Sequence, residues 1–290
     1  MPRAPGTGRT TVRTIVWTAT AMTCFAANSL LCRLALAQDR IDAATFTTLR
    51  VVAAALTLGL VVWAEHRRLP RLARVKPLSV VALLIYLVCF SFAYVRLDAG
   101  SGALIVIAAT QFTMFSVAFR EGERFKPAQW IGLVMAVSGF VYMVLPGASA
   151  PDPVGAVLMA ASGAAFGWFS LLARGVDHPV EANAGIFLWC LLPAAAVNLL
   201  GAPVFKVTPT GLWLAAASGA VATGFGYVAW YRALRGLSAA RAATVQLSMP
   251  VLVAAGGLVF LSEPLTFRLL VASAAMLAGI ALVLGRRAAR

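Results

Sequence analysis

The sequence predicts an all-α polytopic membrane protein with ten transmembrane helices, arranged as two inverted repeats of five helices each. Hydrophobic residues fill 61% of its 290 positions, whereas soluble domains contain roughly 45–50%. They form ten long runs, and features of the first five runs recur in the last five. One helical crossing of a bilayer takes about 20 apolar residues. Ten crossings therefore use most of the chain and leave no room for a separate soluble domain.

Each predicted crossing is an apolar run bounded by charged residues or by the Pro and Gly residues that mark loops. The first run follows an Arg-rich start and superficially resembles a signal peptide, but it extends to about Leu36 and nine more runs follow it. We therefore interpret it as a retained helix. The predicted crossings are 13–36, 43–64, 78–96, 101–119, 128–146, 153–174, 182–201, 209–232, 239–261 and 267–285.

Most Lys and Arg residues fall on one side of the predicted membrane. Cytoplasmic loops are enriched in these residues, and a cytoplasmic N-terminus places eighteen of the 24 on that side. We therefore predict that both termini are cytoplasmic. The net charge of +14 then reflects membrane topology, and nucleic acid is not expected as a partner. The eighteen residues are Arg3, Arg9, Arg13, Arg67, Arg68, Arg71, Arg74, Lys76, Arg120, Arg124, Lys126, Arg174, Arg232, Arg235, Arg241, Arg286, Arg287 and Arg290.

The two halves of the chain, 1–146 and 153–290, are predicted to be the two repeats, because residues recur at an offset of about 140 positions. Each half has five crossings, an odd number, so the second half lies upside down relative to the first. Corresponding residues are therefore expected on opposite sides of the membrane. The pairs are Phe25 and Phe166, Ser29 and Ser170, Leu30 and Leu171, Leu31 and Leu172, Arg33 and Arg174, Tyr94 and Tyr231, Leu97 and Leu234, Glu123 and Glu263, and Gly139 and Gly279.

Several short motifs stand in the second half, and one has a counterpart in the first. They are Tyr231, Ala233 and Leu234, then Pro250, and the run Ser262-Glu263-Pro264-Leu265-Thr266, with Gly122-Glu123 as its counterpart. These motifs resemble the ten-helix EamA-type members of the drug/metabolite transporter superfamily. The segment 224–230, together with 250–252 and Leu261-Ser262, is similar to the group that exports aromatic and other amino acids. The resemblance implies a multi-pass protein of the bacterial inner membrane that binds small metabolites and lipid, acts as a monomer or weak dimer, and needs no cofactor.

In carriers built from inverted repeats, the substrate site lies near the middle of the membrane, between the two halves. We therefore predict a cavity lined by polar and aromatic residues at mid-helix depth. Pro250 is predicted to interrupt the ninth crossing, because proline lacks a backbone N–H. The predicted lining residues are Trp17, Asn28, Tyr86, Phe90, Tyr94, Gln111, Trp168, Tyr227, Trp230, Gln246 and Ser248.

Two spacings support this interpretation. Tyr86, Phe90 and Tyr94 are four residues apart, which places them along one side of a helix. The sequence Gly163-x-x-x-Gly167 permits another helix to approach closely. Alternative roles are open for the same residue types, because Trp and Tyr also anchor helices at the membrane interface, and Gln side chains also bond neighbouring helices.

Ionisable side chains are nearly absent from the middle of the crossings. All ten acidic residues and both histidines fall in loops or at helix ends, so no carboxylate or imidazole is placed for a proton relay. We therefore expect facilitated movement of zwitterionic or neutral solutes rather than obligate proton antiport or movement of dications. Arg50 lies well inside the second crossing. It either snorkels or bonds backbone carbonyls, or it reaches a substrate carboxylate.

Other functional classes fit less well. No histidine is available in the crossings to activate Ser101 of the Gly100-Ser101-Gly102 segment, so we expect no enzyme activity and interpret Ser101 as a helix N-cap. The phosphate-binding loop of an ATP-driven pump is absent, and the four scattered cysteines predict no metal site. We expect an exporter of aromatic and other neutral amino acids and related metabolites. Export of drugs or cationic compounds such as methyl viologen, or a nucleotide-sugar or lipid carrier, is the alternative.

Overall fold

The computed structural model describes residues 12–72, 75–122, 125–147, 149–201, 205–237 and 239–285. Its elements are helices, and ten crossings are long and apolar enough to span a membrane, which confirms the predicted fold class. The first seven are α1 (Val12–Leu36), α2 (Ala43–His66), α3 (Pro77–Tyr94), α4 (Ala99–Arg120), α5 (Pro127–Val144), α6 (Pro153–Leu172) and α7 (Pro179–Gly201). The last three are α8 (Pro209–Ala217), η2 (Ser218–Phe225) and α9 (Gly226–Leu234) together, α10 (Ala239–Gln246) with α11 (Ser248–Leu261), and α12 (Phe267–Gly285).

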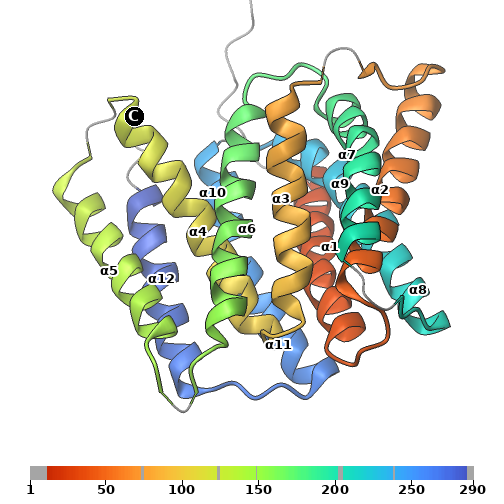
Figure 1. Cartoon of the computed structure of the whole chain (residues 1–290). Helices are drawn as coiled ribbons and strands as arrows, with labels where there is room; N and C mark the ends of the chain where they lie inside the picture. Colours follow the sequence, from red (N-terminus) through yellow and green to blue (C-terminus); the bar gives the residue numbers. More distant parts are fainter. Residues whose placement is uncertain are drawn as a thin grey trace, which may run out of the picture.

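The crossings alternate in direction, so Val12 at the start of α1 and Gly285 at the end of α12 lie on the same face of the bundle (Figure 1). We call this the basic face, and the other one the opposite face. The basic face carries most of the described Lys and Arg residues that flank the helices. These are Arg13, Arg67, Arg68, Arg71, Lys76, Arg120, Lys126, Arg174, Arg232, Arg235 and Arg241.

Helix contacts follow the symmetry of an inverted duplication. α5 packs on α12, α2 on α7 and α4 on α11, and each of these pairs joins corresponding crossings of the two halves. The contact of α3 with α6 corresponds to that of α1 with α9. Figure 1 shows α5 and α12 side by side at one end of the molecule. There, a Cβ added at Gly279 would meet the carbonyl of Gly132, and one added at Gly139 would meet that of Ala272. The offset of 140 residues exchanges these two contacts.

Glycine lets α6 approach α4 closely, as the spacing of Gly163 and Gly167 predicts. A Cβ at Gly163 would lie 2.4 Å from the carbonyl oxygen of Val106, and one at Gly167 would lie 2.8 Å from that of Thr110. The Thr110 hydroxyl also donates a hydrogen bond to the carbonyl of Gly163, at 3.0 Å. The close approach thus permits a hydrogen bond from a side chain of α4 to the backbone of α6.

The eighth crossing is not a regular α-helix, because η2 is a π-helix. A Cβ at Gly219 would lie 2.4 Å from the carbonyl oxygen of Arg50, so α2 runs directly against this segment. From α1, Asn28 Oδ1 accepts hydrogen bonds from the hydroxyls of Ser218 at 2.8 Å and Thr223 at 3.4 Å. π-helical turns occur frequently at functional sites. Here the π-helix packs against two other crossings.

The ninth crossing is interrupted at Leu247, between α10 and α11. In an unbroken helix, the carbonyl of Gln246 would accept a bond from the N–H of residue 250. Because that residue is Pro250, the bond cannot form. The helix is thus interrupted directly after Gln246, the residue whose carbonyl Pro250 leaves without a donor.

The predicted N-cap at Ser101 is wrong. α4 begins at Ala99, with Asp98 as its N-cap residue, so Ser101 lies inside the first turn. The N–H of Ala99 donates to Glu263 Oε2 at 2.7 Å. A carboxylate from the other half of the chain therefore satisfies the start of the helix.

Candidate functional site

A cavity of about 340 Å³ opens at the basic face between α3, α6, α7 and α9. We call it the vestibule. Its inner wall includes Phe169, Ile186 and Tyr231, which also pack on the central hydrophobic core. Its rim is charged and comes from the loops before α3 and before α7. The ionisable rim residues are Arg71, Lys76, Arg174, Asp177, His178 and Glu181.

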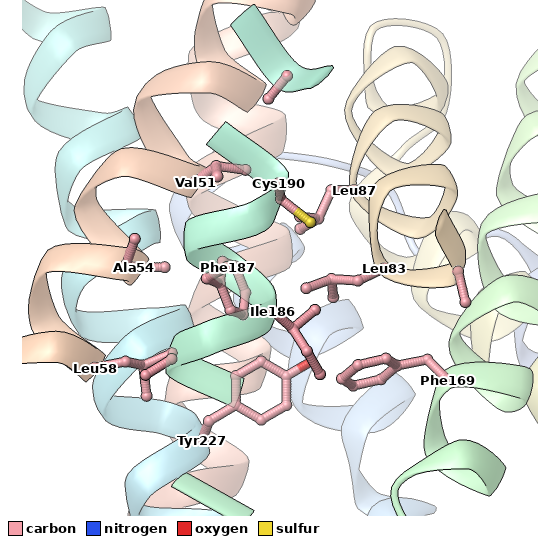
Figure 2. Close-up of a cluster of buried hydrophobic side chains, with 14 of the residues drawn as sticks. Val51, Ala54, Leu58, Leu83, Leu87, Phe169, Ile186, Phe187, Cys190 and Tyr227 are labelled. Carbon is pink, nitrogen blue, oxygen red and sulfur yellow. The ribbon is translucent and has the colours of Figure 1, made fainter. Parts of the chain in front are cut away.

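The core next to the vestibule is rich in aromatic rings. Tyr227 stacks on Tyr231 with ring centroids 6.0 Å apart, and meets Phe187 edge-on at 6.1 Å. Figure 2 shows Tyr227 directed toward Phe169, beside Ile186. An apolar group that enters the vestibule therefore meets aromatic surface.

A row of aromatic side chains on α3 leads from this level toward the opposite face. Ring centroids of Tyr86 and Phe90 are 5.4 Å apart, and those of Phe90 and Tyr94 are 4.8 Å apart, which confirms the predicted alignment on one side of the helix. Tyr86 also contacts Phe166 of α6 at 4.9 Å. At the far end, Tyr94 is fully buried and its hydroxyl donates to the carbonyl of Ala99 at 3.3 Å.

Arg50 lies beside this row and is 0% exposed. Its Nη2 donates to the carbonyl oxygen of Leu87 at 2.9 Å. The guanidinium carbon lies 5.2 Å from the ring centroid of Phe90 and 5.8 Å from that of Phe46. Nε and Nη1 have no hydrogen-bond partner among the described residues. The expected bond to a backbone carbonyl is thus confirmed, whereas full burial contradicts snorkelling.

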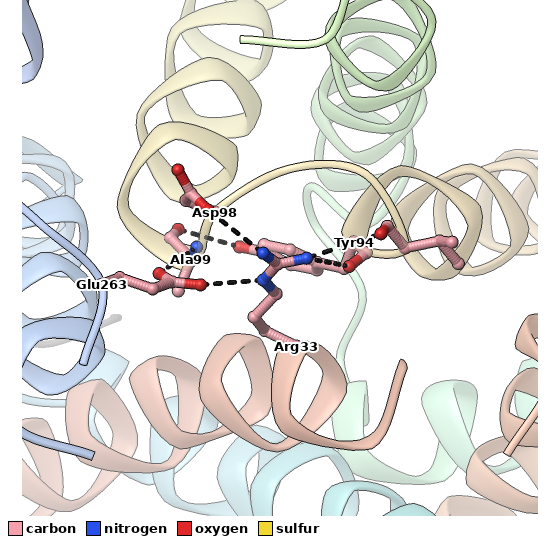
Figure 3. Close-up of polar contacts among 6 residues, drawn as sticks. Arg33, Tyr94, Asp98, Ala99 and Glu263 are labelled. Atoms are coloured by element: carbon pink, nitrogen blue, oxygen red, sulfur yellow. Dashed lines mark hydrogen bonds and ion pairs between the residues drawn. The ribbon is translucent and has the colours of Figure 1, made fainter. Parts of the chain in front are cut away.

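Arg33, at the end of α1, holds together a network that closes the opposite face (Figure 3). Its Nε donates to Glu263 Oε1 at 2.8 Å, its Nη2 to Asp98 Oδ1 at 3.1 Å and its Nη1 to the carbonyl of Tyr94 at 3.1 Å. Glu263 also accepts from the N–H of Ala99, at 2.7 Å. The network joins α1, α3 and α4 of the first half to the loop before α12 in the second half. We call these five residues the lock.

A second connection on the opposite face joins the loop after α1 to the segment before α8. Lys206 Nζ donates to the carboxylate of Asp39. Ile41 and Val207 form an isolated antiparallel bridge. Both halves are therefore tied together at two places on this face.

Corresponding charged residues are exposed to different extents at the two faces. The Arg33 and Glu263 side chains of the lock are only 16% and 13% exposed. Arg174, the counterpart of Arg33, forms a single 3.9 Å contact with Glu121, and these side chains are 52% and 59% exposed. Glu123, the counterpart of Glu263, lies outside the described residues.

Corresponding tyrosines show the same difference. Tyr94 is fully buried and its carbonyl belongs to the lock, whereas its counterpart Tyr231 lines the vestibule. The basic face thus has a cavity of about 340 Å³ where the corresponding residues of the opposite face are joined by the lock, beside which lies a smaller cavity of about 130 Å³.

Two predicted lining residues lie on the side of α1 and α9. Trp17 packs on Phe225, with ring centroids 6.4 Å apart, and under the guanidinium of Arg232 at 4.8 Å. Trp230 is buried and lies 6.2 Å from the ring of Phe25. Both belong to a hydrophobic cluster between α1 and α9, so a lining role for them stays a prediction.

The polar predicted residues are spread over several helix contacts. Asn28 is occupied by its bonds to η2, and Gln111 is buried in α4. Gln246 and Ser248 flank the interruption of the ninth crossing, where the Ser248 hydroxyl donates to the carbonyl of Val245 at 2.7 Å. Their contact with a substrate also stays a prediction.

Trp168 is the predicted residue that the structure places apart from the others. It is 41% exposed, on the side of α6 that also exposes Val154 and Val157. Gly163 and Gly167 face α4 from the other side of this helix. Trp168 therefore lies on the outer surface of the bundle rather than with the aromatic core.

Apart from Tyr94, the residues of the lock were not among those predicted for the site. Their sequence signal is the joint recurrence of an arginine and a glutamate, Arg33 with Arg174 and Glu123 with Glu263, at nearly the same offset. An oppositely charged pair that recurs in inverted halves indicates equivalent contacts at the two faces. Among the described residues, no group of His, Cys, Asp and Glu is arranged to hold a metal ion.

The ten crossings and the open and closed faces are those of a polytopic membrane carrier. A model of the EamA-like transporter family matches residues 12–145 and again residues 153–285. The chain belongs to this family. Each match covers one five-helix half of the bundle.

Curated relatives and a solved structure extend the comparison. An uncharacterized protein of Pseudomonas aeruginosa, PA1977, is 45% identical over 96% of this chain and 96% of its own length. A protein of Streptantibioticus cattleyicolor named a probable terminal-alkyne amino-acid exporter is 29% identical, over 70% of this chain and 71% of its own. A crystal structure with 18% identity superposes with a TM-score of 0.67, over 92% of this chain and 98% of that one, and shows the same fold.

Proposed function

We propose that the protein exports amino acids, aromatic and other neutral ones, and related small metabolites across the bacterial inner membrane by alternating access and without proton coupling. The observation that carries this proposal is the aromatic-walled vestibule at the basic face behind a locked opposite face. The enrichment of Lys and Arg supports assigning the basic face to the cytoplasm. The structure then corresponds to the state in which an exporter receives its substrate.

The inverted repeats supply a mechanism. In such carriers one half rocks against the other around a site between them. Release of the lock, together with closure of the vestibule around Arg174 and Tyr231, would exchange the environments of the corresponding residues. Each face would then adopt the contacts that the other has here.

The nature of the cavity supports the substrate class. Aromatic rings favour apolar and aromatic side chains, and one distantly related protein is named a probable terminal-alkyne amino-acid exporter. The buried charge of Arg50 disfavours cations such as methyl viologen, because like charges repel strongly in a medium of low dielectric constant. The acidic residues all fall in loops or at helix ends, which supports facilitated transport.

The test is counterflow of labelled phenylalanine into liposomes that contain the purified protein and unlabelled amino acid. We expect uptake without a pH gradient, with alanine and threonine as competitors and methyl viologen without effect. Protein-free liposomes are the control. Uptake that requires a proton gradient would contradict the facilitative mechanism, and absence of amino-acid uptake would contradict the substrate class.

A further inference from the structure

Arg50 is a buried charge without a counter-charge. It is 0% exposed, and none of the ion pairs in the described part of the chain includes it. Arginine stays protonated in proteins, so the positive charge persists in the core. A buried charge that lacks a partner is strongly destabilising. A residue of this kind in the interior of a membrane protein indicates a function that requires it.

The hydrogen-bond donors of Arg50 are mostly unused. The guanidinium group has five N–H donors, and its single described hydrogen bond is the one from Nη2 to the carbonyl of Leu87. Nε and Nη1 have no partner among the described residues. The faces of Phe46 and Phe90 flank the group and stabilise its charge only in part. The planar fork of arginine binds carboxylates through two parallel bonds, so a group with two oxygen acceptors suits these donors.

A continuous series of aromatic contacts connects Arg50 to the vestibule. From Phe169 in the vestibule wall, ring centroids lie 6.3 Å from Phe166, which lies 4.9 Å from Tyr86, which lies 5.4 Å from Phe90. The guanidinium carbon of Arg50 is 5.2 Å from the last of these rings. Arg50 does not itself line the vestibule, so a ligand from the vestibule would reach the unused donors only if these rings separated.

We infer that Arg50 binds the carboxylate of the transported molecule, so that the carboxylate is the group required for recognition and the amino group is not. This inference rests on the proposed function and names its substrate class: small monocarboxylates with an apolar or aromatic body. Among the described residues, the acidic side chains that line the vestibule are Asp177 and Glu181 at its rim, where Glu181 pairs with Arg68, and none is paired with Arg50 to bind an ammonium group beside it. Deaminated analogues of amino acids therefore belong to the same class.

The first test uses the wild-type protein and matched competitors. In the phenylalanine counterflow assay, 3-phenylpropionate keeps the ring and the carboxylate, whereas phenethylamine keeps the ring and the ammonium group. We expect 3-phenylpropionate to inhibit at concentrations comparable to phenylalanine, and phenethylamine to be weaker by about tenfold to a hundredfold, the usual effect of losing a charge-assisted hydrogen bond. Inhibition by phenethylamine but not by 3-phenylpropionate would overturn the inference.

The second test is independent of transport. Thermal unfolding of the purified protein in detergent is measured with each of the two compounds, for wild type, Arg50→Gln and the control Arg235→Gln, which changes an exposed arginine at the end of α9. We expect 3-phenylpropionate to raise the unfolding temperature of wild type and of the control, but not that of Arg50→Gln.

If phenylalanine is not transported, the proposed function fails while this measurement still decides the role of Arg50. Equal stabilisation of Arg50→Gln and wild type by 3-phenylpropionate, or no stabilisation of wild type by this compound, would overturn the inference that Arg50 binds the carboxylate. Should Arg50→Gln not fold, the comparison of the two compounds on wild type gives the same decision.

Discussion

At the scale of single residues, Glu263 shows how one carboxylate can fasten two halves of a carrier. One of its oxygens accepts from Arg33 and the other from the N–H of Ala99 at the start of α4. The second bond also places a negative charge at a helix N-terminus, where it is favourable. Because the carboxylate is largely buried, its bonds are stronger than those of an exposed surface pair.

Glu263→Gln should weaken the lock. The amide removes the negative charge and keeps one acceptor, which costs about 1–3 kcal/mol and favours opening of the opposite face. A reporter cysteine at Ser101, which lines a small cavity beside the lock, should then react about tenfold faster with a membrane-impermeant maleimide. Three of the native cysteines are buried and Cys89 is half-buried, and their labelling is measured in parallel.

The matched control for this change is Glu65→Gln. Glu65 pairs with Arg232 at the basic face, where its side chain is 43% exposed. It should leave the labelling rate of the reporter unchanged. Equal rates in the Glu263→Gln protein and the unchanged protein would show that the carboxylate does not hold the opposite face closed.

At the scale of helices, the sequence predicts which segments cross the membrane but not which side of each helix is directed toward the core. Long apolar runs between charged ends define a crossing by length and composition alone. Lipid is as apolar as leucine, so the outer and inner sides of these helices differ little in hydrophobicity. The position of Trp168 in the middle of its crossing therefore did not indicate that its side chain faces outward. The four-residue spacing of Tyr86, Phe90 and Tyr94, in contrast, did predict their alignment.

The irregular segments differ in how far their contacts reach along the chain. The interruption at Leu247 follows from Pro250, four residues after Gln246, and was predictable from local chemistry. The π-helix η2 contacts the backbone of Arg50 and the side chain of Asn28 in other helices, and these contacts could not be read from residues 218–225 alone. The N-cap error at Ser101 has the same origin, because Glu263 from the other half binds the start of α4.

Gly163→Ala should destabilise the contact between α6 and α4. The added Cβ would lie 2.4 Å from a backbone carbonyl, which cannot move aside as a flexible side chain can. Overpacking of this kind costs about 1–3 kcal/mol, visible as a lower unfolding temperature in detergent. Gly59→Ala in α2 is the control, because no atom lies within 4 Å of its added Cβ. Equal unfolding temperatures for the two variants would contradict close packing at Gly163.

At the scale of the whole molecule, the two faces of a nearly symmetric bundle are in different states. The duplication was predictable from recurring residues, because an odd number of crossings forces inversion. Which face is open was not predictable, because the corresponding residues of the two halves can form similar contacts at either face. The difference appears only when the lock and the vestibule are compared in three dimensions.

Cysteine labelling should report this difference directly. Tyr231→Cys is expected to react with an impermeant thiol reagent added at the basic face of oriented membrane vesicles, because residue 231 lines the vestibule. Tyr94→Cys should be protected from both sides, since residue 94 is fully buried. Phenylalanine should slow the first reaction. Equal reactivity of both cysteines would contradict a single closed face.

The unpartnered guanidinium of Arg50 also has an electrical consequence. It lies seven residues after the start of α2, about 10 Å along the helix axis from the opposite face, and so within the transmembrane field. Moving one charge through that field involves about 2.3 kcal/mol per 100 mV. An empty carrier holds this charge alone, a bound monocarboxylate without an ammonium group neutralises it, and a bound zwitterion leaves the net charge unchanged. With the basic face in the cytoplasm, as proposed, and if switching access moves Arg50 relative to the field, a potential that is negative in the cytoplasm therefore favours the empty site facing that side, from which the proposed exporter loads.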